Sequence, residues 1–183
     1  MSYRQQRENE EEEDRETIRF RKIFKEVSGP DMEVDAWELR DILNSALRQD
    51  LRRERFSLES CKSMVALSDD DRTGKLSFNE FRELWDKICE FKDLFQKADS
   101  DNSGMINTNE MRVALASLGF KLKSDVIKGL GLTYGDKDGN LSFANFIHVV
   151  IRVKYIHNAF ESKCRGDKAR FSPEEFLVAE IYS

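Results

Sequence analysis

The chain has 183 residues, a formal net charge of −5 at pH 7 and a hydrophobic fraction of 39%, which together suit one domain with its own core. Lys and Arg are dispersed, and the densest basic cluster (residues 52–55) is expected to coat a connecting segment, so the composition argues against nucleic-acid binding. The sequence has no signal peptide and no apolar run near ~18 residues, so it predicts a soluble protein with no transmembrane segment. Its odd number of cysteines is typical of reduced thiols and indicates a cytoplasmic protein.

The amino-terminal residues 1–15 are acidic and polar, and they are predicted to form a tail or linker before a domain at residues 16–183. A first helix is then indicated by the apolar residues Ile18, Phe20, Ile23 and Phe24. The acidic segment at residues 28–39 follows this helix but lacks an Asp at its start. From the residues alone it is either a loop that binds a cation or a solvated acidic turn capped by Asp35.

Residues 69–80 carry oxygen-bearing side chains at positions 1, 3, 5, 9 and 12, namely Asp69, Asp71, Thr73, Ser77 and Glu80. Gly74 stands at position 6, where the backbone must turn sharply, and Lys75 at position 7 would supply its backbone carbonyl. Calcium is a hard cation that prefers oxygen ligands, and this spacing is that of the EF-hand calcium loop.

Residues 99–110 repeat the same chemistry, with Asp99, Asp101, Ser103, the Met105 carbonyl, Asn107 and Glu110 at the corresponding positions. In both loops the final glutamate is expected to bind calcium with two oxygens. A capping box between Ser77 and Glu80, or Asn107 and Glu110, would explain that glutamate alone. The cap does not explain the acids and glycine upstream, and the two roles are compatible. Ca2+ is therefore the predicted cofactor.

Five units share one pattern, in which an apolar residue precedes the last loop position by four residues: Val34, Leu76, Ile106, Leu141 and Phe171. The spacing from Glu80 to Glu110, and again from Asn145 to Glu175, is only 30 residues. Two hands must therefore share one long helix in each case, over residues 78–97 and 143–163. The pattern predicts an all-α fold of about eight helices with short paired loop strands.

The fourth and fifth loops, residues 134–145 and 164–175, are weaker. The fourth keeps Asp136, Asp138 and Asn140, but Tyr134 and Asn145 replace two charged ligands, so only weak calcium binding is expected. The fifth has Cys164, Lys168 and Ala169 where acids and a glycine belong, and its end is predicted to be a capping box without calcium.

The chain resembles the penta-EF-hand family, and within it most resembles the C-terminal calcium-binding domain of a calpain large (catalytic) subunit. The resembling segments are residues 10–24, 28–39, 61–66, 73–76 and 181–183. The resemblance implies that the first loop binds calcium through the Ser28 carbonyl, Asp31, Glu33 and Glu38. It also implies that Asp50 assists the fourth loop.

Hands pair in twos, so the fifth hand is left with an unpaired strand edge and an apolar face. The resemblance implies a homodimer or a large/small-subunit heterodimer through this hand, with Phe171, Phe176 and Ile181 in the interface, and the partner a calpain small subunit or the protease core. The alternative is burial of this hand within its own chain.

The only histidines, His148 and His157, lie on the apolar helix 143–163. His148 and the nearby Cys164 are expected to be core or interface residues rather than a Cys–His dyad. The chain alone is therefore predicted not to be an enzyme. The resemblance to calpain implies that its parent is a calcium-dependent cysteine endopeptidase. Two functions stay open. One is a regulatory and dimerisation domain of such a protease, favoured by the absence of a Gly/Pro-rich tail. The other is a free-standing calcium sensor that binds target peptides in an apolar cleft.

Overall fold

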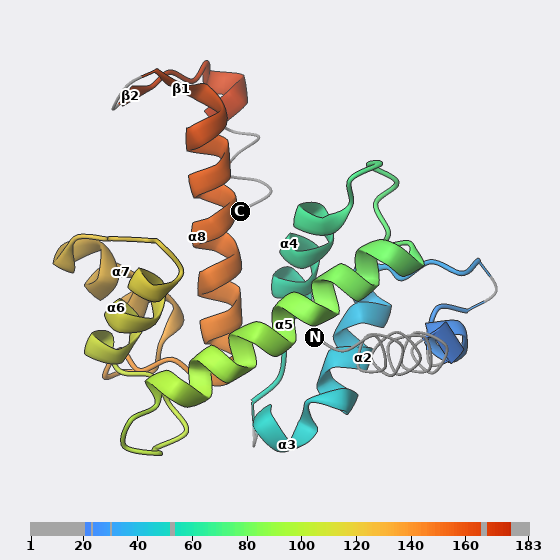
Figure 1. The fold of residues 1–183 in the computed structure, drawn as a ribbon, viewed down its shortest axis with the longest axis horizontal. Coiled ribbons are helices and arrows are strands. Elements are labelled where there is room, and N and C mark those ends of the chain that lie inside the picture. Colours follow the sequence, from blue (N-terminus) through green and yellow to red (C-terminus); the bar gives the residue numbers. More distant parts are fainter. Residues whose placement is uncertain (1–20, 23, 30, 52–53, 166–167, 177–183) are drawn as a thin grey trace, which may run out of the picture.

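The computed structural model describes residues 21–22, 24–29, 31–51, 54–165 and 168–176 (Figure 1). These residues form the helices α2 to α8, helical segments at residues 24–27 and 173–176, and one short hairpin of strands. The predicted all-α fold is confirmed. Of the apolar residues assigned to the first helix, Ile18, Phe20 and Ile23 lie outside the described residues, as do the tail 1–15 and Ile181.

The first two hands contain α2 (Ala36–Ala46), α3 (Arg48–Leu51), α4 (Leu58–Ser68) and the beginning of α5 (Phe78–Ala98). Asp35 caps α2, because its carboxylate accepts hydrogen bonds from the backbone N–H groups of Trp37 and Glu38 at 2.8 and 2.9 Å. Helix α4 packs against α2, α5 and α8, and so lies between the two halves of the molecule.

The other hands contain α6 (Thr108–Ser117), α7 (Ser124–Tyr134) and α8 (Phe143–Lys163). Helices α5 and α8 are the two long shared helices expected at residues 78–97 and 143–163. Figure 1 shows α5 running from the hands that contain α2 and α4 to the hand that contains α6, so it follows the second loop and leads into the third. A movement at either loop therefore acts on the same helix.

The loops pair as the repeat predicts. Val34 and Leu76 form an antiparallel bridge with N–H···O distances of 2.9 and 2.8 Å, and Ile106 and Leu141 form another with both distances at 2.8 Å. All four side chains are fully buried. The fifth loop folds on itself instead, since β1 (Cys164–Arg165) pairs with β2 (Lys168–Ala169).

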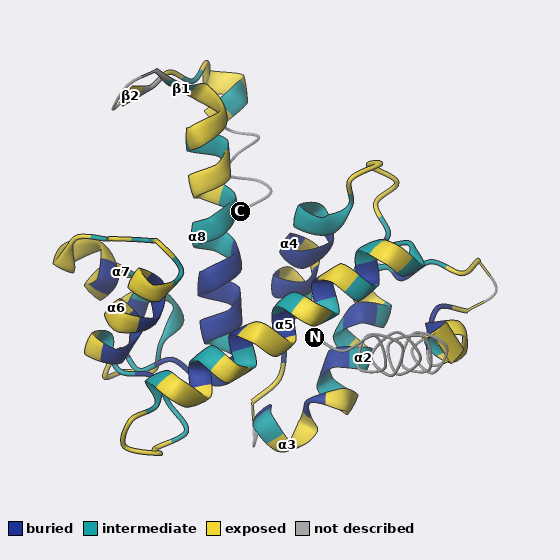
Figure 2. Cartoon of the chain, in the orientation of Figure 1, coloured by how far each residue is buried: buried dark blue, intermediate teal, exposed yellow. Residues whose placement is uncertain are grey.

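Phenylalanines join the helices in the core. Phe95 of α5 meets the rings of Phe143 and Phe146 of α8 at centroid distances of 5.3 and 5.5 Å. Phe24 packs on Phe78, at the first turn of α5, at 5.4 Å. Figure 2 shows that the first half of α8 is buried in the core whereas its second half is largely open to solvent. The fifth hand stands at that exposed end.

No helix among the described residues is long and apolar enough to cross a membrane.

Candidate calcium-binding sites

The second loop is organised around the Asp69 carboxylate. Its two oxygens accept hydrogen bonds from the N–H groups of Thr73 at 3.0 Å and Gly74 at 2.7 Å, while the Asp71 carboxylate accepts a longer one from Thr73 at 3.2 Å. Burial raises the pKa of Asp69, but these backbone hydrogen bonds outweigh burial and hold the pKa below its usual value. The loop therefore keeps an ionised carboxylate at neutral pH.

Glu80 closes the second loop from the first turn of α5. One of its oxygens accepts from the Asp70 N–H at 2.9 Å and the other from the Ser77 N–H at 2.8 Å. The hydrogen bond from Ser77 is the predicted cap, and the one from Asp70 ties the far end of the loop to the same carboxylate. Although burial raises the pKa of Glu80, hydrogen bonds from Ser77 and Asp70 lower it overall.

The third loop repeats this arrangement. Asp99 accepts from the N–H groups of Ser103 and Gly104, both at 2.9 Å, and Asp101 accepts from Ser103 at 3.0 Å. Glu110 accepts from the N–H of Ser100 at 3.0 Å. The Ser103 hydrogen bond lowers the pKa of Asp101. Two loops of different sequence thus fold to one geometry, as expected from the shared positions of their acids and glycines.

The backbone conformation at position 6 explains the glycine in each loop. Gly74 and Gly104 have φ angles of 82° and 78°, in the left-handed region that residues with a Cβ rarely adopt. In each loop the first Asp accepts hydrogen bonds from the N–H groups of this glycine and of the residue before it.

Two clusters of three carboxylates suit a metal ion. In each, one oxygen from every carboxylate lies within 4.8 Å of the others, and the clusters are Asp69, Asp71 and Glu80, and Asp99, Asp101 and Glu110. Hard oxygen donors at this spacing fit calcium. The hydroxyls of Thr73 and Ser103 face the same loops, since they donate to the carbonyls of Lys75 and Met105 at 3.2 and 3.0 Å.

The first loop gathers its acids around Gly29. A Cβ added there would lie 3.7 Å from Glu38 Oε1 and 3.9 Å from Asp31 Oδ1, so both carboxylates point toward this residue. Glu38 also accepts from the Asp35 N–H at 3.0 Å, which makes it the capping partner of Asp35. Ser28, the predicted carbonyl ligand, is fully buried.

The Lys75 side chain was not anticipated from the sequence. Its ammonium lies 2.5 Å from Asp31 Oδ2 and 3.8 Å from Glu33 Oε2, although Lys75 belongs to the second loop. This contact holds the pKa of Asp31 below its usual value and raises that of Lys75. The Val34–Leu76 bridge was the available signal, because it sets Lys75 beside the first loop.

Hydrogen bonds between residues of the fourth loop hold it closed. Asp136 accepts from the N–H groups of Asp138 and Asn140, both at 2.9 Å, which lowers its pKa. Asn145 donates to the Tyr134 carbonyl at 2.7 Å, so an amide stands where the other loops have a glutamate. This arrangement supports the expectation that calcium binding here is weak at best.

Asp50, expected to assist the fourth loop, lies on α3 and accepts from Lys92 of α5 at 2.8 Å. Its assistance to the fourth loop stays a prediction. In the fifth loop, Ser172 and Glu175 form the predicted capping box, with N–H···O distances of 2.9 and 3.2 Å. Glu175 also pairs with Lys163 at 2.6 Å.

The two histidines pack against aromatic rings, His148 against Tyr134 at 5.2 Å and His157 against Phe120 at 5.3 Å. Burial lowers the pKa of His148, so this side chain is neutral at pH 7. The buried position of His148 agrees with its predicted packing role, whereas His157 is exposed.

Comparison with known proteins places these loops in a family. An EF-hand domain pair matches residues 30–88, and an EF hand domain matches residues 90–118. Calpain small subunit 2 of Homo sapiens is 37% identical over 178 residues, which cover 95% of this chain and 72% of that protein. The chain belongs to the penta-EF-hand family. EF-hands bind Ca2+ and are not catalytic, so this penta-EF-hand chain is by itself a calcium-binding regulatory chain and not an enzyme.

Two further proteins are similar to this chain, one in sequence and one in fold. Calpain small subunit 1 of Rattus norvegicus is 38% identical over 179 residues, covering 96% of this chain and 65% of that protein. A solved structure of a homolog of programmed cell death 6 protein from Leishmania major Friedlin matches the fold with a TM-score of 0.64 at 24% identity, covering 86% of this penta-EF-hand chain and 84% of the other. The predicted relationship to calpain subunits is confirmed, whereas these small-subunit relatives leave open the finer assignment to a large subunit.

Proposed function

We propose that residues 16–183 form the calcium-sensing and dimerisation domain of a calpain-like cysteine protease, with residues 1–15 as its linker. Three loops bind calcium in this proposal. The ligands are Asp69, Asp71, Thr73, the Lys75 carbonyl and Glu80; Asp99, Asp101, Ser103, the Met105 carbonyl and Glu110; and the Ser28 carbonyl, Asp31, Glu33 and Glu38. The observation that carries the proposal is the pair of three-carboxylate clusters that face into the second and third loops.

A route for the calcium signal runs through the first turn of α5. Glu80 is part of that turn, and Phe78 in the same turn packs on the fully buried Phe24 of the preceding helical segment. Calcium that takes the Glu80 carboxylate as a ligand, in place of its present hydrogen bonds, would therefore reposition this turn and the Phe78 ring on which Phe24 packs. Such a shift of population between two states is driven by the difference in their calcium affinities. In the proposal, the amino-terminal helix passes the change to the protease core.

The fifth hand offers the dimer contact. Its residue after the last loop position, Phe176, is 60% exposed, whereas the equivalent residues of the other hands are almost fully buried. These residues are Leu39, Phe81, Met111 and Phe146. Phe171 is the fifth hand's equivalent of the four paired strand residues, and no bridge joins it to another described residue. A second fifth hand, from a copy of this chain or from another penta-EF-hand subunit, would cover both side chains.

Phe176→Asp tests the dimer. The full chain is expected to sediment at twice its 21.4 kDa mass, and Phe176→Asp to sediment as a monomer, because a buried unpaired carboxylate strongly opposes association. Leu132→Asp is the control, since Leu132 is 77% exposed on α7, away from the fifth hand. Analytical ultracentrifugation gives the masses. A wild-type chain that stays monomeric at all concentrations would rule out the homodimer and leave a heterodimer.

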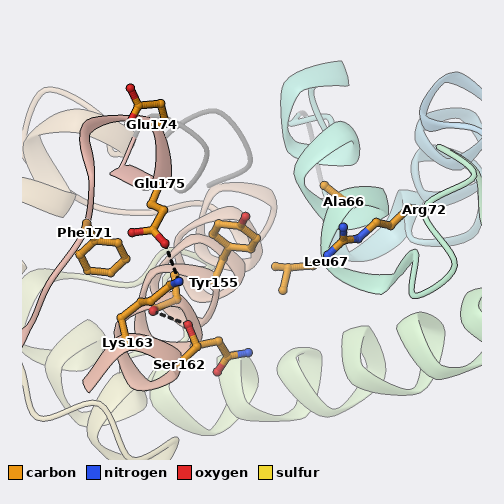
Figure 3. Close-up of a pocket in the computed structure, with 11 residues that line it drawn as sticks. Ala66, Leu67, Arg72, Tyr155, Ser162, Lys163, Phe171, Glu174 and Glu175 are labelled. Atoms are coloured by element: carbon orange, nitrogen blue, oxygen red, sulfur yellow. Dashed lines mark hydrogen bonds and ion pairs between the residues drawn. The ribbon is translucent and has the colours of Figure 1, made fainter. Parts of the chain in front are cut away.

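A cleft in the structure supports a second candidate function, that of a free-standing calcium sensor that binds peptides. It has a volume of about 590 Å³ and lies between α4 with the second loop and α8 with the fifth hand (Figure 3). Apolar groups from both sides line it, among them Leu67, Ala159 and Phe171. An apolar peptide would fit this chemistry. A monomeric chain whose cleft takes up the dye ANS only with calcium, and not in Leu67→Glu, would favour the sensor over the dimerising subunit.

A reducing, cytoplasmic location is part of the proposal, because Cys61, Cys89 and Cys164 are all thiols. Burial raises the pKa of Cys61 to about 12. The buried Cys61 thiol stays protonated at pH 8, so iodoacetamide is expected to spare it in the native chain and to modify it in urea. Peptide mass spectrometry measures the labelling. Equal rates of Cys61 labelling in the native and the unfolded chain would contradict the buried position.

A further inference from the structure

Lys75 stands between the first two loops. It belongs to the second loop, where its backbone carbonyl accepts a hydrogen bond from the Thr73 hydroxyl at 3.2 Å. Its ammonium reaches across to the first loop and contacts the carboxylates of Asp31 and Glu33 at 2.5 and 3.8 Å. Both of these acids are ligands of the first loop in the proposed function.

The reach of Lys75 follows from the strand pairing. Val34 and Leu76 pair antiparallel, and both side chains are fully buried. Neighbouring residues on paired strands point to the opposite face. Glu33 and Lys75 each precede a buried residue, so both side chains stand on the solvent face, where they meet. The strand pairing thus sets Lys75 beside the first loop, and the long lysine side chain makes the contact.

We propose that the Lys75 ammonium is a built-in counter-ion of the first loop that competes with calcium for Asp31 and Glu33. The inference rests on the proposed calcium site in that loop and adds how its affinity is set. Calcium needs both carboxylates as oxygen ligands, and an ammonium ion hydrogen-bonded to them must leave before the metal binds. The lysine therefore lowers the calcium affinity of the first loop below the value expected from its number of carboxylate ligands.

The ion pair between Lys75 and the two acids is exposed enough for calcium to displace it. The side chain of Lys75 is 37% exposed, and those of Asp31 and Glu33 are 45% and 39% exposed. Ion pairs at such half-exposed positions are weak, so a divalent cation at modest concentration replaces the ammonium. Removing the competing charge is expected to strengthen calcium binding at the first loop by about two- to tenfold.

The third loop shows that the position tolerates an uncharged side chain. Met105 occupies the place of Lys75 in the third loop, where its carbonyl likewise accepts from the hydroxyl two residues earlier. Its neighbour Ile106 pairs with Leu141 as Leu76 does with Val34. Lys75→Met therefore copies a residue already present in an equivalent loop of this chain. The variant is expected to fold and to keep the loop backbone.

The test is a calcium titration of the full chain followed by NMR. The amide signal of Gly29 reports the first loop, and that of Gly104 reports the third loop as an internal reference. Glu38→Gln removes a proposed ligand of the first loop. The change of the Gly29 signal that reports calcium binding in that loop should therefore be lost in this variant. Lys75→Met is compared with Lys75→Arg, which keeps a positive charge beside the same carboxylates, and with Lys128→Met, which removes an exposed charge from α7.

We expect Lys75→Met to lower the calcium midpoint of the Gly29 signal by about two- to tenfold, Lys75→Arg to move it less, and Lys128→Met to leave it unchanged. A Gly29 midpoint in Lys75→Met equal to or above that of the wild type would overturn the inference while leaving the calcium site intact. If Gly29 responds to calcium in neither chain, the first-loop site itself is wrong and the inference falls with it.

Discussion

Glu80→Gln and Glu110→Gln are each expected to abolish one calcium site. Each glutamate supplies the charged oxygens that close its loop from the first turn of the following helix. An amide offers one uncharged oxygen in place of two, and ligand charge tunes EF-hand affinity over orders of magnitude. The affinity of the altered loop should therefore fall at least about a hundredfold, and isothermal titration calorimetry should count one site fewer in each variant.

Glu90→Gln is the matched control for this pair, because Glu90 is exposed on α5 and lies outside both loops. It removes the same charge from the same helix as Glu80→Gln. An unchanged number of sites in Glu80→Gln or Glu110→Gln would show that the loop does not use its final glutamate.

Of the substitutions proposed for this chain, Phe146→Ala is expected to lower the free energy of unfolding most. Phe146 is fully buried on α8, one residue after the end of the fourth loop, and its ring meets Phe95 of α5 at 5.5 Å. Truncation of a buried phenylalanine leaves a cavity and costs about 3–5 kcal/mol. Urea unfolding in the presence of EGTA measures this free energy without the contribution of bound calcium.

Leu132→Ala provides the comparison, because Leu132 is an apolar residue on α7 that is 77% exposed. Its free energy of unfolding should stay within about 0.5 kcal/mol of the wild type. If Phe146→Ala were no more destabilising than Leu132→Ala, the two long helices would not be joined by this core contact.

Much of the fold follows from the sequence, because an EF-hand loop places each functional group at a fixed position. The acids, the glycine at position 6 and the apolar residue at position 8 together predicted the second and third loops, their capping boxes and the strand pairs. The 30-residue spacing predicted the two shared helices, which the structure places at Phe78–Ala98 and Phe143–Lys163.

The sequence could not predict contacts that join different loops. Lys75 was expected to contribute only its carbonyl, because position 7 has no side-chain role within its own loop; its ammonium contacts Asp31, which is 44 residues away. Likewise, the substitution at Asn145 indicated a lost ligand but not the hydrogen bond to the Tyr134 carbonyl that replaces it. Such contacts depend on how two loops lie against each other in space.

Counting the calcium ions bound by the purified full chain tests the central claim most directly. A calorimetric titration is expected to give three sites, in the first, second and third loops, with any binding to the fourth appearing only at much higher calcium. A chain that binds no calcium would contradict the account, because the two clusters of three carboxylates would then be no more than helix caps.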